Sequence, residues 1–173
     1  AAVGIRAAAV GAALVPAAVL IGIGVRQPEV DVIECSARVL LDTGSPYLST
    51  PTEVTDVNPY LPGMALFGFP RLVFGDFVLG DARLWFLAAF AASFAAAVVM
   101  ARTALPGRAG AVEWLGPSPT GPLWAALACP LIALPVAVGG HDLPVVGLMC
   151  LGLALAARRR PDEAGLVVGL ATT

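Results

Sequence analysis

The chain has 173 residues, of which 58% are hydrophobic and 13% are charged. Ordinary soluble domains are about 45–50% apolar and about 25% charged, so this composition excludes that class and predicts a membrane protein. The formal net charge is -2, and the arginines form no basic cluster of the kind that binds nucleic acid, which excludes nucleic acid as the expected partner.

Four apolar runs are long enough, or nearly long enough, to supply the about 20 residues of a membrane-spanning helix. They cover residues of about 3–25, 82–101, 119–139 and 143–157, and a fifth run begins near Ala164. The first run exceeds the roughly 7–15 apolar residues of a signal-peptide core, so we interpret it as a span. Because the chain lacks an initial Met and stops soon after the fifth run begins, we expect a single transmembrane domain, 1–173, that is a fragment of a larger protein.

These runs predict an all-α fold, a polytopic bundle of transmembrane helices. In hydrocarbon, backbone N–H and C=O groups must be hydrogen-bonded within the protein, and a helix achieves this within one segment. The runs also lack the alternation of apolar and polar residues that is typical of barrel strands.

A more polar loop of about 26–81 separates the first two runs, and an acidic segment, VDVIECSARVLLDTGSPYLS, lies near its start. On a helical wheel, aliphatic side chains cover most of this segment, and the charged side chains share one narrow stripe: Asp31, Glu34, Arg38 and Asp42. Start and stop signals flank the segment, namely Pro28 before it and Gly44 and Pro46 after it. The pattern predicts an amphipathic helix that lies along the membrane surface in the first outward loop.

Asp31 has two interpretations. With Glu34 three residues later it forms the pattern of a capping box, in which side chains bond the free N–H groups at a helix start. A catalytic carboxylate is the rarer explanation. Glu34 and Arg38 have the i,i+4 spacing of a helical ion pair.

The segment YLPGMALFGFPRLVFG, residues 60–75, is apolar but short, and prolines and glycines interrupt it. Three placements remain open for it. It lies in the membrane interface, it enters the membrane and returns, or it spans as a broken helix.

Arginines near the ends of short loops indicate the orientation. Arg102 and Arg108 lie in one such loop, and Arg158 to Arg160 lie in another. If both loops are cytoplasmic, the loop of 26–81 and the GGHD turn at 139–142 face outward, together with most of the acidic residues.

Taken together, these segments resemble a known family. A spanning helix is followed by the acidic segment, then by NPYLPGMALFGFPRLVFGD, and later by GGHDLPVVGLMCLGLALAARRRPDEAGLVVGLA. This order is similar to the amino-terminal half of GT-C-type integral membrane glycosyltransferases, in particular family-87-like mannosyltransferases that use polyprenyl-phosphate-mannose. The residues that carry the resemblance are Gly44-Ser45-Pro46-Tyr47 for the GG-x-P-Y motif of the family, Asn58-Pro59-Tyr60-Leu61-Pro62 for its Y-P-P element, and Gly140-His141-Asp142 for its G-Q-x-N turn.

The resemblance implies an enzyme that moves a sugar, expected to be mannose, from a polyprenyl-phosphate carrier to a lipid or glycan hydroxyl on the outer face, with inversion. The catalytic base of the family follows the first span, and by position it corresponds to Asp31. Arg38 and Arg71 are expected to contact the phosphate. The expected contacts to the rest of the substrate are Tyr47, Tyr60, His141 and Asp142.

Each of these binding residues also has a structural interpretation. The two arginines suit the membrane interface, where long cationic side chains reach toward water, and the tyrosines suit an aromatic belt. A lone His in a loop between spans is often an ordinary interfacial residue. The resemblance implies no cofactor besides the lipid-linked donor and leaves the need for a divalent metal open. With one His and no CxxC pair, we predict no metal site on the protein.

The expected partners are the lipid-linked sugar donor, a glycan or lipid acceptor, and membrane lipids, and the expected location is the bacterial plasma membrane, crossed several times. Two alternatives belong to another class of protein, a non-catalytic scaffold subunit and a transporter segment. A transporter is expected to place ionisable residues inside its spans, whereas the acids here cluster outside the apolar runs.

Overall fold

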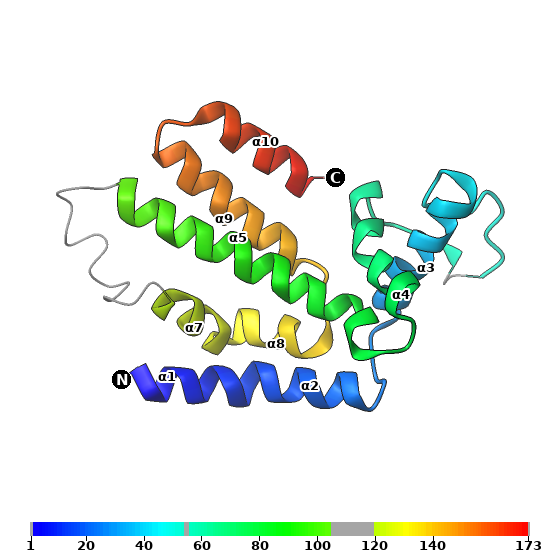
Figure 1. Cartoon of the computed structure of the whole chain (residues 1–173), viewed down its shortest axis with the longest axis horizontal. Coiled ribbons are helices and arrows are strands. Elements are labelled where there is room, and N and C mark those ends of the chain that lie inside the picture. Colours follow the sequence, from blue (N-terminus) through cyan, green and yellow to red (C-terminus); the bar gives the residue numbers. More distant parts are fainter. Residues whose placement is uncertain (1, 54–55, 105–119, 173) are drawn as a thin grey trace.

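The computed structural model describes residues 2–53, 56–104 and 120–172, and every regular element within these ranges is a helix. Figure 1 shows long helices side by side in one body, with a group of short helices gathered at one end of it. The prediction of an all-α fold is confirmed.

The first helix that is long and apolar enough to cross a membrane runs from Val3 to Gly22. It consists of α1 (Ala2–Ala9), the π-helical turn η1 (Val10–Leu14) and α2 (Val15–Gly22). Pro16 has no N–H to donate and its ring crowds the preceding turn, so the wider π turn allows the helix to continue past it. The second such helix is α5 (Ala82–Ala104), which meets the same test over Ala82–Arg102.

A third crossing is available only as a bent pair, α7 (Gly121–Ala128) and α8 (Pro130–Val138), which meet at 76°. Cys129 between them has an extended backbone, with φ -72° and ψ 127°, as the residue before a proline usually does. The described residues therefore contain two candidate spans, or three if the bent pair counts as one. A larger number of crossings stays a prediction.

The last two helices are shorter. α9 (Leu143–Ala157) has 15 residues, about 22 Å at about 1.5 Å per residue, against a hydrocarbon core of about 30 Å. α10 (Pro161–Ala171) begins slightly before Ala164, where a fifth run was predicted. Figure 1 shows α9 alongside α5, and α10 alongside α9.

Glycines allow the bundle helices to approach closely. α5 packs along α9, and α10 packs on α9 as well. A side chain at Gly147 of α9 would collide with Phe90 and Ser93 of α5, and one at Gly152 would collide with Val168 of α10. Small residues at such contacts are typical of helix pairs in membranes, because they bring the two backbones together. The first span lies against α7 and α8.

Four short helices form a cap on one end of the bundle (Figure 1). We define the cap as α3 (Pro28–Thr43), η3 (Pro62–Gly68), α4 (Phe69–Phe74) and η4 (Val78–Gly80). The predicted end of the first is confirmed, since Gly44 ends α3 in the left-handed conformation, with φ 77°. Its start is earlier than predicted, because Pro28 is the first residue of the helix and does not precede it. η3 and α4 together are too short to cross a membrane, which favours the two placements of 60–75 that do not span.

The capping box predicted for Asp31 is wrong. The N-cap residue of α3 is Gln27, and no side chain caps this helix end. Helix α3 starts at Pro28, so Asp31 is its fourth residue and lies too far along the helix to bond the free N–H groups of the first turn.

The predicted charged stripe of α3 is correct for three of its four members. Asp31, Arg38 and Asp42 are exposed, whereas Glu34 is buried. The reason is Gly68 at the end of η3, where a side chain would collide with the backbone oxygen of Ile33. Because this glycine lets η3 lie directly on α3, η3 covers Glu34. The predicted ion pair of Glu34 with Arg38 is replaced by pairs with other arginines.

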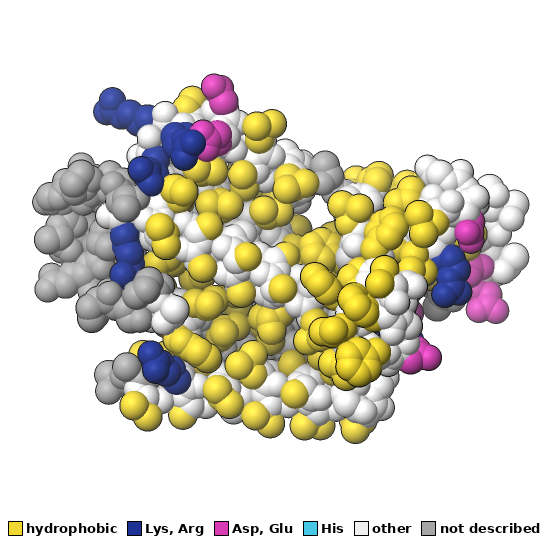
Figure 2. Space-filling model, in the orientation of Figure 1, with side chains coloured by type: hydrophobic (Ala, Val, Ile, Leu, Met, Phe, Trp, Pro, Cys, Tyr) yellow, Lys and Arg dark blue, Asp and Glu magenta, His cyan; other side chains and the backbone are white. Residues whose placement is uncertain are grey.

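Charge is unevenly distributed along the bundle. Figure 2 shows basic side chains gathered at the end opposite the cap, with some acidic side chains beside them, and several acidic side chains together with a basic one on the cap. The basic end holds residues from α1, from the last turn of α5 and from the turn after α9: Arg6, Arg102 and Arg158 to Arg160. Four further arginines lie at the capped end, Arg26, Arg38, Arg71 and Arg83, so the orientation stays a prediction. Arg108, also used for the orientation, lies outside the described residues.

Candidate functional site

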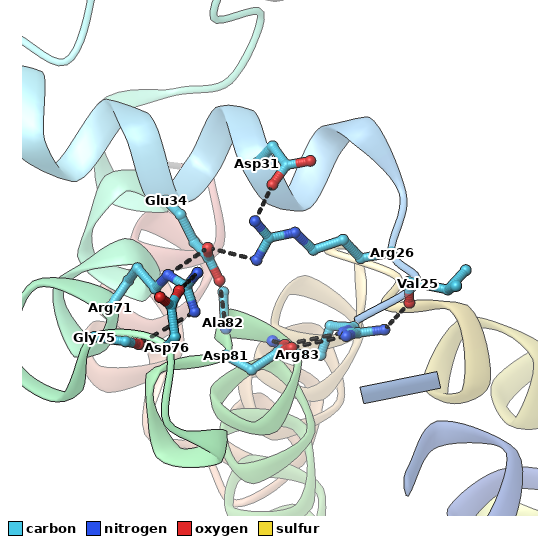
Figure 3. A network of polar contacts seen from close by, with 10 residues as sticks. All are labelled: Val25, Arg26, Asp31, Glu34, Arg71, Gly75, Asp76, Asp81, Ala82 and Arg83. Carbon is cyan, nitrogen blue, oxygen red and sulfur yellow. Dashed lines mark hydrogen bonds and ion pairs between the residues drawn. The ribbon is translucent and has the colours of Figure 1, made fainter. Parts of the chain in front are cut away.

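Glu34 is the centre of a charged network that joins the cap to the bundle (Figure 3). Its side chain is only 5% exposed. Its Oε2 accepts a hydrogen bond from Nη1 of Arg26 at 2.9 Å and lies 3.4 Å from Nε of Arg71. Its Oε1 accepts the backbone N–H of Ala82 at 3.2 Å. Ala82 is the first residue of α5, so this N–H has no partner within its own helix.

Each of the two arginines has a second acidic partner nearer the surface. Arg26 pairs with Asp31, and Arg71 pairs with Asp76. The side chain of Asp31 is 52% exposed and that of Asp76 is 95% exposed. Water therefore competes for both of these outer pairs, unlike the pairs made by Glu34.

A second buried pair, Asp81 with Arg83, holds the start of α5. Nε and Nη2 of Arg83 donate to the two carboxylate oxygens of Asp81 at 2.9 and 2.7 Å. Nη1 of Arg83 donates to the carbonyl oxygen of Val25 at 2.7 Å, just beyond the first span. The pair thus ties the end of that span to the beginning of α5, and Gly139, with φ 92°, leaves room for the Arg83 side chain.

Burial disfavours the ionised form of both Glu34 and Asp81, but their pKa values shift in opposite directions. Burial raises the pKa of Glu34 above its ordinary value of 4.5, and the Ala82 N–H together with Arg26 and Arg71 only partly offsets this. Burial also opposes ionisation of Asp81, but the hydrogen bonds and charge of Arg83 outweigh it, so the pKa of Asp81 lies below its ordinary value of 3.8. The bidentate geometry of Arg83 accounts for the difference.

A second feature of this end of the molecule is a cavity of about 480 Å³ between η3, α5, α9 and α10, which we call the apolar cavity. Most of its walls are apolar side chains, including Met64, Phe67 and Leu148. Its polar members come from two segments about 80 residues apart in the chain: Tyr60, His141 and Asp142.

These polar members lie close to one another. The ring centroids of Tyr60 and His141 are 4.7 Å apart, and Nε2 of His141 is 3.6 Å from Oδ1 of Asp142. Nδ1 of His141 is buried and has no hydrogen-bond partner in the described part of the chain. Burial raises the pKa of Tyr60, and the carboxylates of Glu29 and Asp142 raise it further.

The structure thus brings three of the predicted binding residues together in the wall of the apolar cavity: Tyr60, His141 and Asp142. The hydroxyl of Tyr47 donates to the backbone oxygen of Tyr60 at 2.8 Å, so Tyr47 supports the loop rather than lining the cavity. Arg38 is exposed on α3, away from the lining of the cavities described here.

Asp31 is not among the described residues that line the apolar cavity. It is nevertheless near that side of the molecule, because the adjacent Val30 packs on Gly139: a Cβ at Gly139 would lie 3.3 Å from Val30 Cγ2. The turn that begins at Gly139 leads directly to His141. The first turn of α3 and this turn are therefore direct neighbours.

Arg71 lines a different space, a cavity of about 350 Å³ that we call the polar cavity. Its charged lining consists of three arginines and two acids: Arg26, Arg71, Arg83, Asp76 and Asp81. Apolar residues from the end of α2 and from the turn before α5 complete the wall, among them Ile21, Phe77 and Val78.

Sequence reasoning missed Arg26, Asp81 and Arg83, and it placed Glu34 on the wrong face. One signal was available. Arg83 stands in the first turn of a long apolar run, where an arginine requires a partner, and Asp81 is two residues away. The pairing of Glu34 with the start of α5 had no such signal, because it joins residues 48 positions apart.

Within the described ranges, no three His, Cys, Asp or Glu side chains are placed to hold a metal ion together. Comparison of the chain with protein-family models, with curated proteins and with solved structures gave no match.

Proposed function

We propose that this chain is part of a multi-pass enzyme of the bacterial plasma membrane, a GT-C-type glycosyltransferase that transfers a sugar from a polyprenyl-phosphate carrier. The acceptor is a lipid or glycan hydroxyl on the outer face. The observation that carries the proposal is the apolar cavity at the capped end, with Tyr60, His141 and Asp142 together in its wall.

The cavity suits a substrate that is apolar over most of its length and polar at one end. Its volume of about 480 Å³ falls within the roughly 300–1,000 Å³ that is usual for ligand sites. The wall of Met64, Phe67 and Leu148 would hold part of a polyprenyl chain. Tyr60 and His141 would contact the sugar, through ring stacking and hydrogen bonds to hydroxyl groups.

The transfer needs a carboxylate, and Asp31 is the one we assign. It would take the proton of the acceptor hydroxyl as that oxygen forms a bond to the anomeric carbon from the face opposite the phosphate. The bond from the anomeric carbon to the phosphate oxygen breaks, and the polyprenyl phosphate leaves with the electron pair. The exposure of Asp31 and the contact of its neighbour Val30 with the Gly139 turn support this assignment.

Asp142 is the alternative base for the same step, because it lines the cavity itself and its side chain is 82% exposed. The orientation that we propose places the cap outside and the arginine-rich end in the cytoplasm. It puts either carboxylate on the side of the membrane where the proposed acceptor lies.

The test is sugar transfer in membranes that contain the full-length protein to which this chain is proposed to belong, because the chain alone is expected to be inactive; a radiolabelled polyprenyl-phosphate sugar is the donor. Asp31→Asn, Asp142→Asn and Asp42→Asn are compared at equal protein levels. Asp42 is the matched control, since it is an exposed acid on the same helix as Asp31.

Loss of a catalytic base is expected to lower the rate about 10²- to 10⁴-fold. A loss confined to Asp31→Asn supports the assignment, whereas a loss confined to Asp142→Asn moves the base to the cavity wall. If neither variant reduces transfer, or if the wild type transfers no sugar from this donor, the transferase proposal is refuted.

A further inference from the structure

The segment that joins the cap to the second span, residues 73–79, carries an apolar surface. Its sequence is VFGDFVL, and all seven residues are exposed. We call this segment the apolar loop, after its five large apolar side chains: Val73, Phe74, Phe77, Val78 and Leu79. We propose that the apolar loop inserts into the membrane surface on the capped side, at the boundary between headgroups and acyl chains, and holds the cap against the bilayer. The inference uses the two candidate spans and does not depend on the transferase function.

Such exposure is unusual for consecutive apolar residues outside a span. The exposed fractions of the five side chains are 74%, 42%, 63%, 50% and 45% in chain order. Single apolar side chains are common on a surface in water, but a contiguous group marks a contact with a protein or with a membrane. Figure 2 shows apolar side chains gathered where the cap meets the bundle, around the position of α4 in Figure 1.

The position of the loop beside both candidate spans favours the membrane. Helix α5 begins three residues after Leu79, and the carbonyl oxygen of Leu79 accepts the indole N–H of Trp85 at 2.9 Å. Phe77 and Val78 line the same cavity as Ile21, which lies near the end of the first span. Aromatic side chains at the ends of spans are typical of the headgroup level. Because both spans leave the bilayer next to this loop, lipid is what its exposed side chains meet there.

Glycines keep the loop short and close to the start of α5. A side chain at Gly80 would collide with the backbone oxygen of Gly75, so the two ends of the turn are in contact. Gly75 has φ 57° and ψ -138°, a conformation that glycine adopts readily. The N–H of Gly80 donates to the carbonyl oxygen of Phe77 at 2.7 Å. The chain therefore has no slack here, and the apolar side chains project outward from a closed turn.

The one charged residue of the loop, Asp76, has its charge balanced. Its carboxylate pairs with Arg71, and Nη1 of Arg71 also donates to the carbonyl oxygen of Gly75 at 3.1 Å. An unpaired acid within an apolar loop would oppose insertion, because burying a lone charge is costly. The side chain of Asp76 is 95% exposed, so it can reach the water of the headgroup region while its apolar neighbours lie deeper.

Helix α3 offers no comparable surface to the membrane. Three of its apolar side chains are fully buried in the protein: Val30, Ile33 and Ala37. Its exposed side chains are mostly charged or polar, and Leu41 is its one exposed large apolar residue. The amphipathic pattern of α3 thus serves packing within the protein. The cap reaches the bilayer through the apolar loop instead.

The experiment measures depth in the membrane with nitroxide spin labels on the purified chain in phosphatidylcholine liposomes. The native cysteines are first replaced by alanine: Cys35, Cys129 and Cys150. A single cysteine is then introduced and labelled at Leu79, Leu48 or Val19. Leu48 is the matched control, because it is a leucine of the loop after α3 with an exposed fraction of 41%, against 45% for Leu79. Val19, 53% exposed on the first span, is the reference for lipid.

Accessibility to molecular oxygen, which concentrates in lipid, is compared with accessibility to a nickel chelate, which stays in water. The ratio of the two at Leu79 should exceed that at Leu48 by at least about fivefold, because an apolar phase strongly excludes a polar reagent. It should remain below the ratio at Val19, since an interfacial loop enters only about 5–10 Å.

A charge in the loop tests its role. With the label at Leu79, Phe77→Asp should lower the ratio at least about twofold, because a carboxylate resists transfer out of water. Leu41→Asp places the same charge at an exposed site of α3 and should leave the ratio unchanged. Phe77 is 63% exposed, as Leu41 is, so neither change disturbs the core, and circular dichroism checks that both variants keep their helices.

Equal ratios at Leu79 and Leu48 would overturn the proposal. Low accessibility of Leu79 to both reagents would overturn it too, because protein, for example a second copy of the chain, would then cover the loop. A ratio at Val19 as low as that at Leu48 would remove the first span from the membrane and the proposal with it. No response to Phe77→Asp would refute insertion of the loop.

Discussion

Replacing Glu34 by alanine should loosen the cap from the bundle. The substitution removes the buried carboxylate that accepts the Ala82 N–H and faces Arg26 and Arg71. Breaking a buried ion pair by removing one partner typically costs about 3–5 kcal/mol. Here the remaining side chains of Arg26 and Arg71 are 25% and 24% exposed, and each keeps an outer acid, so both can recover part of their solvation. We therefore expect a loss of about 2–3 kcal/mol in the free energy of unfolding.

Thermal unfolding in detergent, followed by circular dichroism, measures this loss. For a chain of this size, about 2–4 °C per kcal/mol predicts a fall of about 5–10 °C. Asp31→Asn is the matched control, because it removes a half-exposed partner of the same Arg26 and should cost at most about 1 kcal/mol. Hydrogen exchange adds a local measurement, in which the amides of α3 should exchange faster while those of α9 stay protected. If Glu34→Ala is no less stable than Asp31→Asn, Glu34 is not the anchor of the cap.

Four further predictions follow from the packing and from the pKa directions. Gly68→Val should destabilise the chain by about 1–3 kcal/mol in the same unfolding assay, since its side chain would meet the Ile33 oxygen, whereas Gly165→Val, at an open position, should cost less. Gly147→Leu should separate α5 from α9 and reduce cross-linking between cysteines introduced on facing positions of the two helices, and unchanged cross-linking would contradict the contact described here. The free energy that Asp81 adds to folding can be measured as the difference between wild type and Asp81→Asn in unfolding experiments at several pH values. It should be complete above the ordinary pKa of 3.8 and disappear as the pH falls through the lowered pKa of the folded state. The reason is that the folded state binds this proton less tightly than the unfolded state does. Glu34 should show the opposite pH dependence, because its pKa is raised in the folded state. The free energy of unfolding of the wild type should fall relative to that of Glu34→Gln as the pH rises through the raised pKa. A difference independent of pH would refute the pKa direction given for either group.

The helices could be predicted from the sequence because their causes are local. Apolar runs marked α5 and the first span, and Pro28 and Gly44 marked the ends of α3. The shortness of η3 and α4 also followed from prolines and glycines in 60–75. These features depend on hydrophobic length and on turn residues, which can be identified one segment at a time.

The network could not be predicted, because its causes are contacts between distant segments. A helical wheel correctly groups Glu34 with Asp31 and Arg38, but it does not show which neighbour will cover one side of the stripe. The neighbour is η3, and Gly68, which is 34 residues from Glu34, lets η3 approach the backbone of α3. The family resemblance named Tyr60 and His141 as substrate contacts, but the contact between their rings was not predicted, because nothing in their spacing indicates it.

The acids of the first loop therefore have two different physical roles. Glu34 and Asp81 are buried, and each accepts hydrogen bonds from an arginine side chain and from a backbone N–H. Glu34 joins α3 to the start of α5, whereas the pair of Asp81 and Arg83 ties the start of α5 to the end of the first span. Asp31 and Asp76 are exposed and pair with Arg26 and Arg71, where water competes for them. Because Val30 and Arg83 both meet Gly139, the buried pairs also set the distance between the first turn of α3 and the turn that carries His141. A site built from these two turns depends on buried charges that would themselves never touch the substrate.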